Sequence, residues 1–140
     1  MRVVLDTNVL VSGIFFTGAP FEILRAWRHG RFRLCLDPEI ALEYEAVLDR
    51  LRKQFPTVDA RQVLALVVSH ADVAAAPALD RAVSADPDDD KFIACAIAAG
   101  ASFVVSGDHH LLEVGEYRGV RIVKPRAFLD HHVTQPGELL

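Results

Sequence analysis

Short aliphatic runs alternate along this chain with segments whose apolar residues recur at helical spacing. The runs cover residues 2–6, 32–36, 102–106 and 121–123, and helical patterns fill most of the sequence between them. Strands that alternate with helices usually form parallel sheets, because a parallel connection needs a long crossover that a helix can supply. The sequence therefore predicts a three-layer α/β fold, in which helices flank a mainly parallel central sheet.

The length and composition fit a single domain. The chain has 140 residues, 51% of them hydrophobic, and no stretch rich in glycine, serine or proline divides it. We expect one domain over residues 1–132 and a C-terminal tail over 133–140. Asp6 and Asn8 interrupt the first apolar run, which is too short for a signal peptide or a membrane span. This predicts a cytoplasmic protein that does not enter a membrane.

Glycine, proline and capping residues set the expected helix boundaries. Gly13 and Gly18 indicate a loop after the first strand. The expected helices cover residues 20–29, 37–53, a segment capped by Thr57, residues 92–99 closed by Gly100, and a last helix after Pro125. Cys35 and Cys95 stand among apolar neighbours without metal-site spacing, so two buried thiols are expected, with a disulfide as the minor alternative.

Two carboxylates end predicted strands. Asp6 closes the run of residues 2–6, and Asp108 follows the run of residues 102–106 after Gly107. In open α/β sheets, ligands bind beyond the C-terminal ends of the strands. Asp6 is the stronger candidate, because an acid at the end of a buried strand needs a partner, whereas a Gly-Asp pair also occurs in ordinary turns.

Helical spacing indicates two further candidate acids, but the evidence for them is weaker than for the acids at strand ends. Most acids of residues 86–90 are explained as helix caps, but Asp90 shares a face with apolar residues three, four and seven places on. Glu43 and Glu45 border the apolar face of the helix over residues 37–53, and periodicity does not choose between them. Clustered carboxylates repel one another and recruit hard divalent cations such as Mg²⁺ or Mn²⁺.

Four segments in order resemble the successive motifs of PIN domains. They are VVLDTNVLVS at residues 3–12, EYEAVL at 43–48, DPDDDKFIACAIAAGA at 86–101 and FVVSGDHHLL at 103–112. The match extends over about residues 2–130. Within that family the chain resembles the VapC-like branch, the toxin components of type II toxin–antitoxin systems.

The resemblance implies a PIN-like domain and a ribonuclease that hydrolyses RNA phosphodiester bonds with Mg²⁺ or Mn²⁺. It assigns the catalytic and metal-binding acids to Asp6, Glu43, Asp90 and Asp108, and supporting roles to Asn8 and Ser106. It also implies a small antitoxin partner and a homodimer. One position departs from the family, since His110 stands where many relatives have another aspartate.

Two other functions remain open at this stage. A phosphatase of the haloacid dehalogenase type also uses an aspartate after its first strand, but it expects a second aspartate where this chain has Asn8. An inert PIN-like module that binds RNA or protein is the non-enzymatic alternative. The net charge of −4 argues against binding of nucleic acid by bulk positive charge, although bound cations would reverse the sign at a carboxylate cluster.

Overall fold

A computed structural model describes residues 1–133 of the chain. Residues 134–140, which hold all but the first residue of the expected tail, lie outside the described residues. The first tail residue, Val133, is buried and belongs to the hydrophobic core. The hydrophobic core therefore includes the first residue of the expected tail.

Six strands and seven α-helices make up residues 1–133. The strands are β1 (Arg2–Leu5), β2 (Arg33–Leu36), β3 (Asp72–Val73), β4 (Phe103–Val105), β5 (Glu116–Tyr117) and β6 (Val120–Val123). The helices are α1 (Thr7–Phe15), α2 (Ala19–Arg28), α3 (Pro38–Leu51), α4 (Ala60–His70), α5 (Asp90–Ala99), α6 (His109–Val114) and α7 (Pro125–His131), with a short 3₁₀ helix, η1 (Pro87–Asp89), before α5.

The strands form one mainly parallel sheet, as the alternating pattern predicts. Their order is β3-β2-β1-β4-β6-β5, and β5 alone runs antiparallel to its neighbour. Strands β1 and β4 are adjacent at the centre, with Leu5 paired to Val105. Because both strands run the same way, the residues that follow them emerge at the same edge of the sheet.

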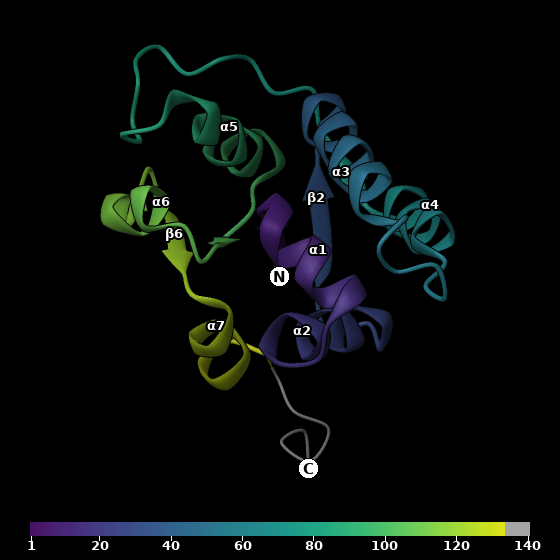
Figure 1. The fold of residues 1–140 in the computed structure, drawn as a ribbon. Coiled ribbons are helices and arrows are strands. Elements are labelled where there is room, and N and C mark those ends of the chain that lie inside the picture. The colour runs from purple at the N-terminus through teal and green to yellow at the C-terminus, as the bar shows by residue number, and fades with distance from the viewer. Residues whose placement is uncertain (134–140) are drawn as a thin grey trace.

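Helices cover the sheet and complete a three-layer α/β fold. Helix α5 packs on β1 and β2, while α1 packs on α2 and α3. Helices α3 and α4 lie together on one flank of the molecule, and α6 and β6 lie on the opposite flank (Figure 1). Within residues 1–133 no single helix is long and apolar enough to cross a membrane, and α1 with α2 reaches that length only across a bend of 88°.

The largest departure from the expected secondary structure is helix α1, which occupies the first part of the expected loop. Gly13 lies inside this helix, and only residues 16–18 separate it from α2. A Cβ atom at Gly13 would lie 2.6 Å from Leu24 Cδ1 and 2.8 Å from the Pro20 carbonyl oxygen. The glycine therefore permits close packing of α1 on α2 and does not mark a turn.

Other departures are smaller and have local causes. Asp59, rather than Thr57, caps α4 by accepting a hydrogen bond from the Gln62 amide at 3.2 Å. Strands β3 and β5 and helix α6 were not expected, and each is six residues long or shorter. Cys35 and Cys95 are both buried and free, as expected.

Candidate functional site

Asp6 lies buried where β1 passes into α1. Its carboxylate caps α1 by accepting a hydrogen bond from the Val9 amide at 2.9 Å, and the Ser106 hydroxyl donates a second hydrogen bond to it. Burial raises the pKa of Asp6 above its ordinary value, and the negative charge of Asp108 acts in the same direction, while the two hydrogen bonds oppose the shift. The side chain is thus held in one position in an environment that disfavours its charge.

Asp108 reaches the same edge from β4 and caps α6. Its carboxylate accepts a hydrogen bond from the His110 amide at 2.8 Å, and its own amide donates to Ser106 Oγ at 2.9 Å. Ser106 Oγ therefore bonds both to the carboxylate of Asp6 and to the backbone of Asp108. The His110 amide lowers the pKa of Asp108. Ser106 thus links the two acids, and its expected supporting role stays a prediction.

Glu43 faces this edge from α3, whereas Glu45 is exposed on the same helix. The Thr7 hydroxyl donates a hydrogen bond to Glu43, and Lys91 Nζ lies 2.9 Å from its carboxylate. Lys91 is a largely buried lysine of α5, with 11% of its side chain exposed. The structure therefore distinguishes the two glutamates that helical periodicity left equivalent, and it adds Lys91 to the site.

Asp90 has a different environment from the one expected for it. Its two carboxylate oxygens accept hydrogen bonds from the Val83 amide at 2.9 Å and the Ser84 amide at 2.8 Å. These bonds anchor the segment that precedes η1 against the start of α5. The carboxylate of Asp90 is thus engaged with the backbone of this segment, and its expected role as a metal-binding acid stays a prediction.

Asp89, which was not among the expected site residues, lies beside Asp108. Burial, together with the neighbouring Asp108 carboxylate, raises the pKa of Asp89 to about 7. Its Oδ2 atom is buried and has no hydrogen-bond partner within residues 1–133. A buried polar atom without a partner is costly in a folded protein and commonly marks a missing ion or water.

Helical spacing in the sequence also favours Asp89 as an inward-facing acid. The residues three, four and seven places after it are Phe92, Ile93 and Ala96, and all three are buried. By the same spacing Asp90 leads to Ile97, which is only partly buried. Asp89 is therefore in better phase with the buried face of α5.

Asn8 lies at the mouth of the site and is exposed. It lines an open pocket together with Asp86, Gly107, Asp108, His109 and His110. A histidine thus lines the pocket close to Asp108, at the position where the chain departs from the family pattern.

The residues at this edge fit a divalent cation. One ligand atom from each of Asp86, Asp89 and His110 lies within 4.8 Å of the others, and a second such group contains Asp108, His109 and His110. One oxygen of Asp89 has no hydrogen-bond partner within residues 1–133, and repulsion from Asp108 adds to the effect of burial in raising the pKa values of Asp6 and Asp89. A cation bound here would relieve that repulsion.

Comparison with known proteins identifies the family to which the chain belongs. The model of the PIN domain, a domain with a nuclease-type fold, matches residues 2–110. Among solved structures the chain is similar to the crystal structure of PAE2754 from Pyrobaculum aerophilum, with 17% identity, a TM-score of 0.57, and coverage of 91% of this chain and 85% of that chain. At that identity the likeness shows a shared fold. No curated protein matches the chain. Because the family model covers most of the chain and all the acids of the site, the protein belongs to the PIN domain family.

Proposed function

We propose that this protein is a ribonuclease that depends on a divalent metal, Mg²⁺ or Mn²⁺, and hydrolyses phosphodiester bonds in RNA. The observation that carries the proposal is the meeting of Asp6, Asp108 and Asp89 at the C-terminal edge of the sheet, where one buried oxygen of Asp89 has no hydrogen-bond partner among residues 1–133. Such an arrangement destabilises the metal-free fold, which is understandable if its role is to hold cations.

Asp6, Glu43, Asp89 and Asp108 are the residues proposed to hold metal, with Asn8 and Ser106 in support. Divalent cations bound there would activate water and offset the charge that develops on the phosphate oxygens. Ser106 and the Val9 amide fix the orientation of Asp6. Thr7 and Lys91 hold Glu43 at the edge of the site.

A cleavage assay with a matched variant tests the proposal. Purified protein is incubated with mixed cellular RNA and Mg²⁺ or Mn²⁺, with EDTA as a control, beside the Asp6→Asn variant. We expect cleavage that EDTA stops and that the variant loses while its circular dichroism spectrum remains native. Cleavage of equal rate by the variant would refute the site. Release of phosphate from p-nitrophenyl phosphate without RNA cleavage would favour the phosphatase alternative.

The cellular role is proposed from the resemblance to VapC-like toxins. We propose that the protein is the toxin of a type II toxin–antitoxin pair, acts in the cytoplasm as a homodimer, and is inhibited by a small antitoxin protein. Expression from an inducible plasmid should then arrest growth, and the Asp6→Asn variant should not. Normal growth at matched levels of active protein would contradict the toxin role but leave the nuclease proposal intact.

A further inference from the structure

The first turn of α6 brings an imidazole to the carboxylates of η1. One ring nitrogen of His110 lies within 4.8 Å of ligand oxygens of both Asp86 and Asp89. The two acids come from opposite ends of the segment of residues 86–89, and the histidine comes from the segment after β4. Three ligand atoms from two separate parts of the chain thus face a common point.

The spacing of these atoms suits a single cation. Metal–ligand bonds of about 2.1 Å place two ligands on opposite sides of an ion about 4.2 Å apart. The limit of 4.8 Å among the three atoms exceeds this value by an amount that small side-chain rotations can close. The partnerless Oδ2 atom of Asp89 belongs to the same group of residues.

The ring nitrogens of His110 are available for such a role. His110 Nδ1 lies 3.7 Å from Asp108 Oδ1, which is too long for a hydrogen bond, and no hydrogen bond to its ring is found within residues 1–133. A metal-free histidine with a structural role would ordinarily bond a carbonyl or carboxylate oxygen through one ring nitrogen, as His70 does with the Leu66 carbonyl at 3.0 Å.

A nitrogen donor changes which cations the site prefers. Mg²⁺ favours a shell of oxygen ligands and water, whereas imidazole favours first-row transition metals, whose affinities rise from Mn²⁺ onward along the series. We infer that His110 is a metal ligand, together with Asp86 and Asp89, and that it makes this site prefer Mn²⁺ or a heavier transition-metal ion to Mg²⁺. The inference rests on the proposed function, since it concerns a metal of the same site.

Pulsed electron paramagnetic resonance of the Mn²⁺-loaded protein detects the nitrogen directly, without an activity measurement. We expect a ¹⁴N coupling from a bound imidazole in the wild-type protein. The coupling should disappear in His110→Asp, which offers oxygen in place of nitrogen. It should persist in His109→Asn, since His109 is the more exposed neighbour and is absent from the group with Asp86 and Asp89.

Calorimetric titration with Mn²⁺ and Mg²⁺ tests the preference. The ratio of Mn²⁺ to Mg²⁺ affinity should fall roughly tenfold or more in His110→Asp, because changes even in outer partners of a metal shift affinity by about 10–100-fold. Mn²⁺ bound to wild-type protein without nitrogen coupling, or coupling lost in His109→Asn alone, would overturn the inference while the proposed function stood. Failure of the wild-type protein to bind either ion would instead remove the metal-dependent function itself.

Discussion

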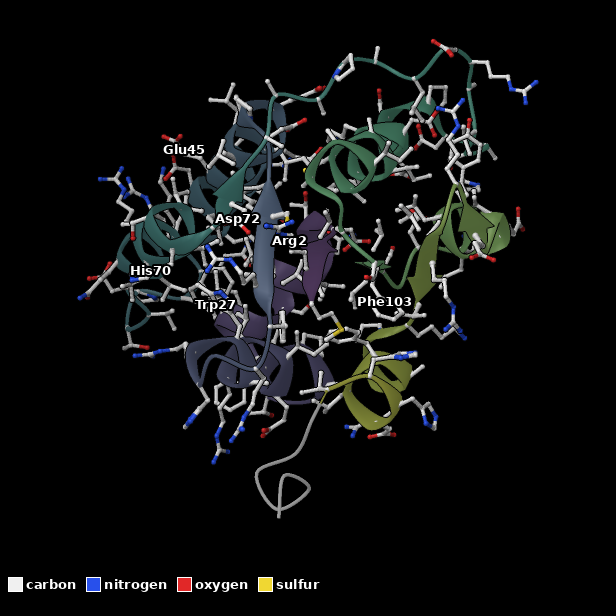
Figure 2. The ribbon with its side chains drawn as sticks, turned by 180° about the vertical axis from the view of Figure 1, so that it is seen from behind. Arg2, Trp27, Glu45, His70, Asp72 and Phe103 are labelled. Carbon is white, nitrogen blue, oxygen red and sulfur yellow. The ribbon has the colours of Figure 1, made fainter. Side chains whose placement is uncertain are left out.

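Aspartates at the two ends of the central sheet have opposite electrostatic environments. At the start of β3, Asp72 pairs with Arg33 through contacts of 2.6 and 2.8 Å and with Arg2 at 3.1 Å, and the hydrogen bond from Arg33 lowers its pKa. Arg2 and Asp72 lie together beside β2 (Figure 2). At the other end, Asp6 and Asp89 have raised pKa values.

The difference separates a structural carboxylate from carboxylates that can serve a function. Asp72 finds its cations within the fold, so it needs no ligand and only ties the starts of three strands together. Among the acids of the C-terminal edge, Glu43 has Lys91, but Asp89 retains an oxygen without a partner. Unneutralised acids that a fold brings together are candidates for metal binding, whereas an acid of equal type beside arginine is not.

The largest expected effect comes from neutralising one aspartate at each end. Asp108→Asn should reduce metal-dependent RNA cleavage by about 100-fold or more, because it removes a ligand oxygen at the centre of the site. Asp72→Asn should leave the initial rate of cleavage within about twofold, since Asp72 starts its strand and lies away from the site. A comparable loss of cleavage in both variants, measured with folded protein, would contradict the distinction between a structural Asp72 and a functional Asp108.

Neighbouring aspartates at the start of α5 allow a sharper comparison. Asp89→Asn should lose most of the cleavage activity without any decrease in the unfolding temperature. Asp90→Asn should keep the site but lose about 1–3 kcal/mol in the free energy of unfolding, because one backbone amide of residues 83–84 loses its acceptor. Urea unfolding and initial cleavage rates measure the two effects. Loss of cleavage in Asp90→Asn, with cleavage kept in Asp89→Asn, would instead support Asp90 as the ligand.

The stability of the metal-free protein should depend on pH. The pKa of Asp89 is about 7 in the folded protein and near 3.8 when unfolded, so between these values the folded state binds more protons. Stability contributed by this group is therefore present at low pH and is lost as pH rises toward 7. Thermal unfolding in EDTA should show a decrease of several degrees from pH 5 to pH 7.5. Asp89→Asn should lack most of it, and saturating Mn²⁺ should reverse it.

The smallest effect is expected at the arginine pairs. Asp72→Asn should lower the unfolding temperature slightly at low salt, and the difference should shrink in 0.5 M NaCl, because exposed ion pairs are screened by salt. A large loss that salt does not change would show that Asp72 contributes more than charge pairing at the edge of the sheet.

Much of the fold was accessible from the sequence because its signals are local. Aliphatic runs predicted β1, β2, β4 and β6, and the Asp37-Pro38 start of α3 is confirmed by an Asp37 cap on the Ile40 amide at 2.8 Å. Helix α1 was missed because Gly13 resembles a turn residue until the helix that contacts it is known. Strand β3 has two residues and depends on pairing with β2, so no local pattern identifies it.

The site was predictable in part for the same reason. Asp6 and Asp108 follow strands, and strand ends are readable from sequence. Which of Asp89 and Asp90 faces Asp108 depends on the angle at which α5 leaves η1, and one residue changes that direction by about 100°. The positions of Lys91 beside Glu43 and of His110 beside Asp86 depend on contacts between segments distant in sequence.

The hydrogen bond between Ser106 and Asp6 joins residues 100 positions apart. During synthesis Asp6 and Glu43 emerge from the ribosome long before β4, and β4 must pair with β1 before Ser106 and Asp108 can reach them. A nascent chain that ends before residue 103 thus has three of the four acids proposed to hold metal but lacks Asp108 and the assembled site. The proposed activity would therefore require nearly the whole domain to have been made.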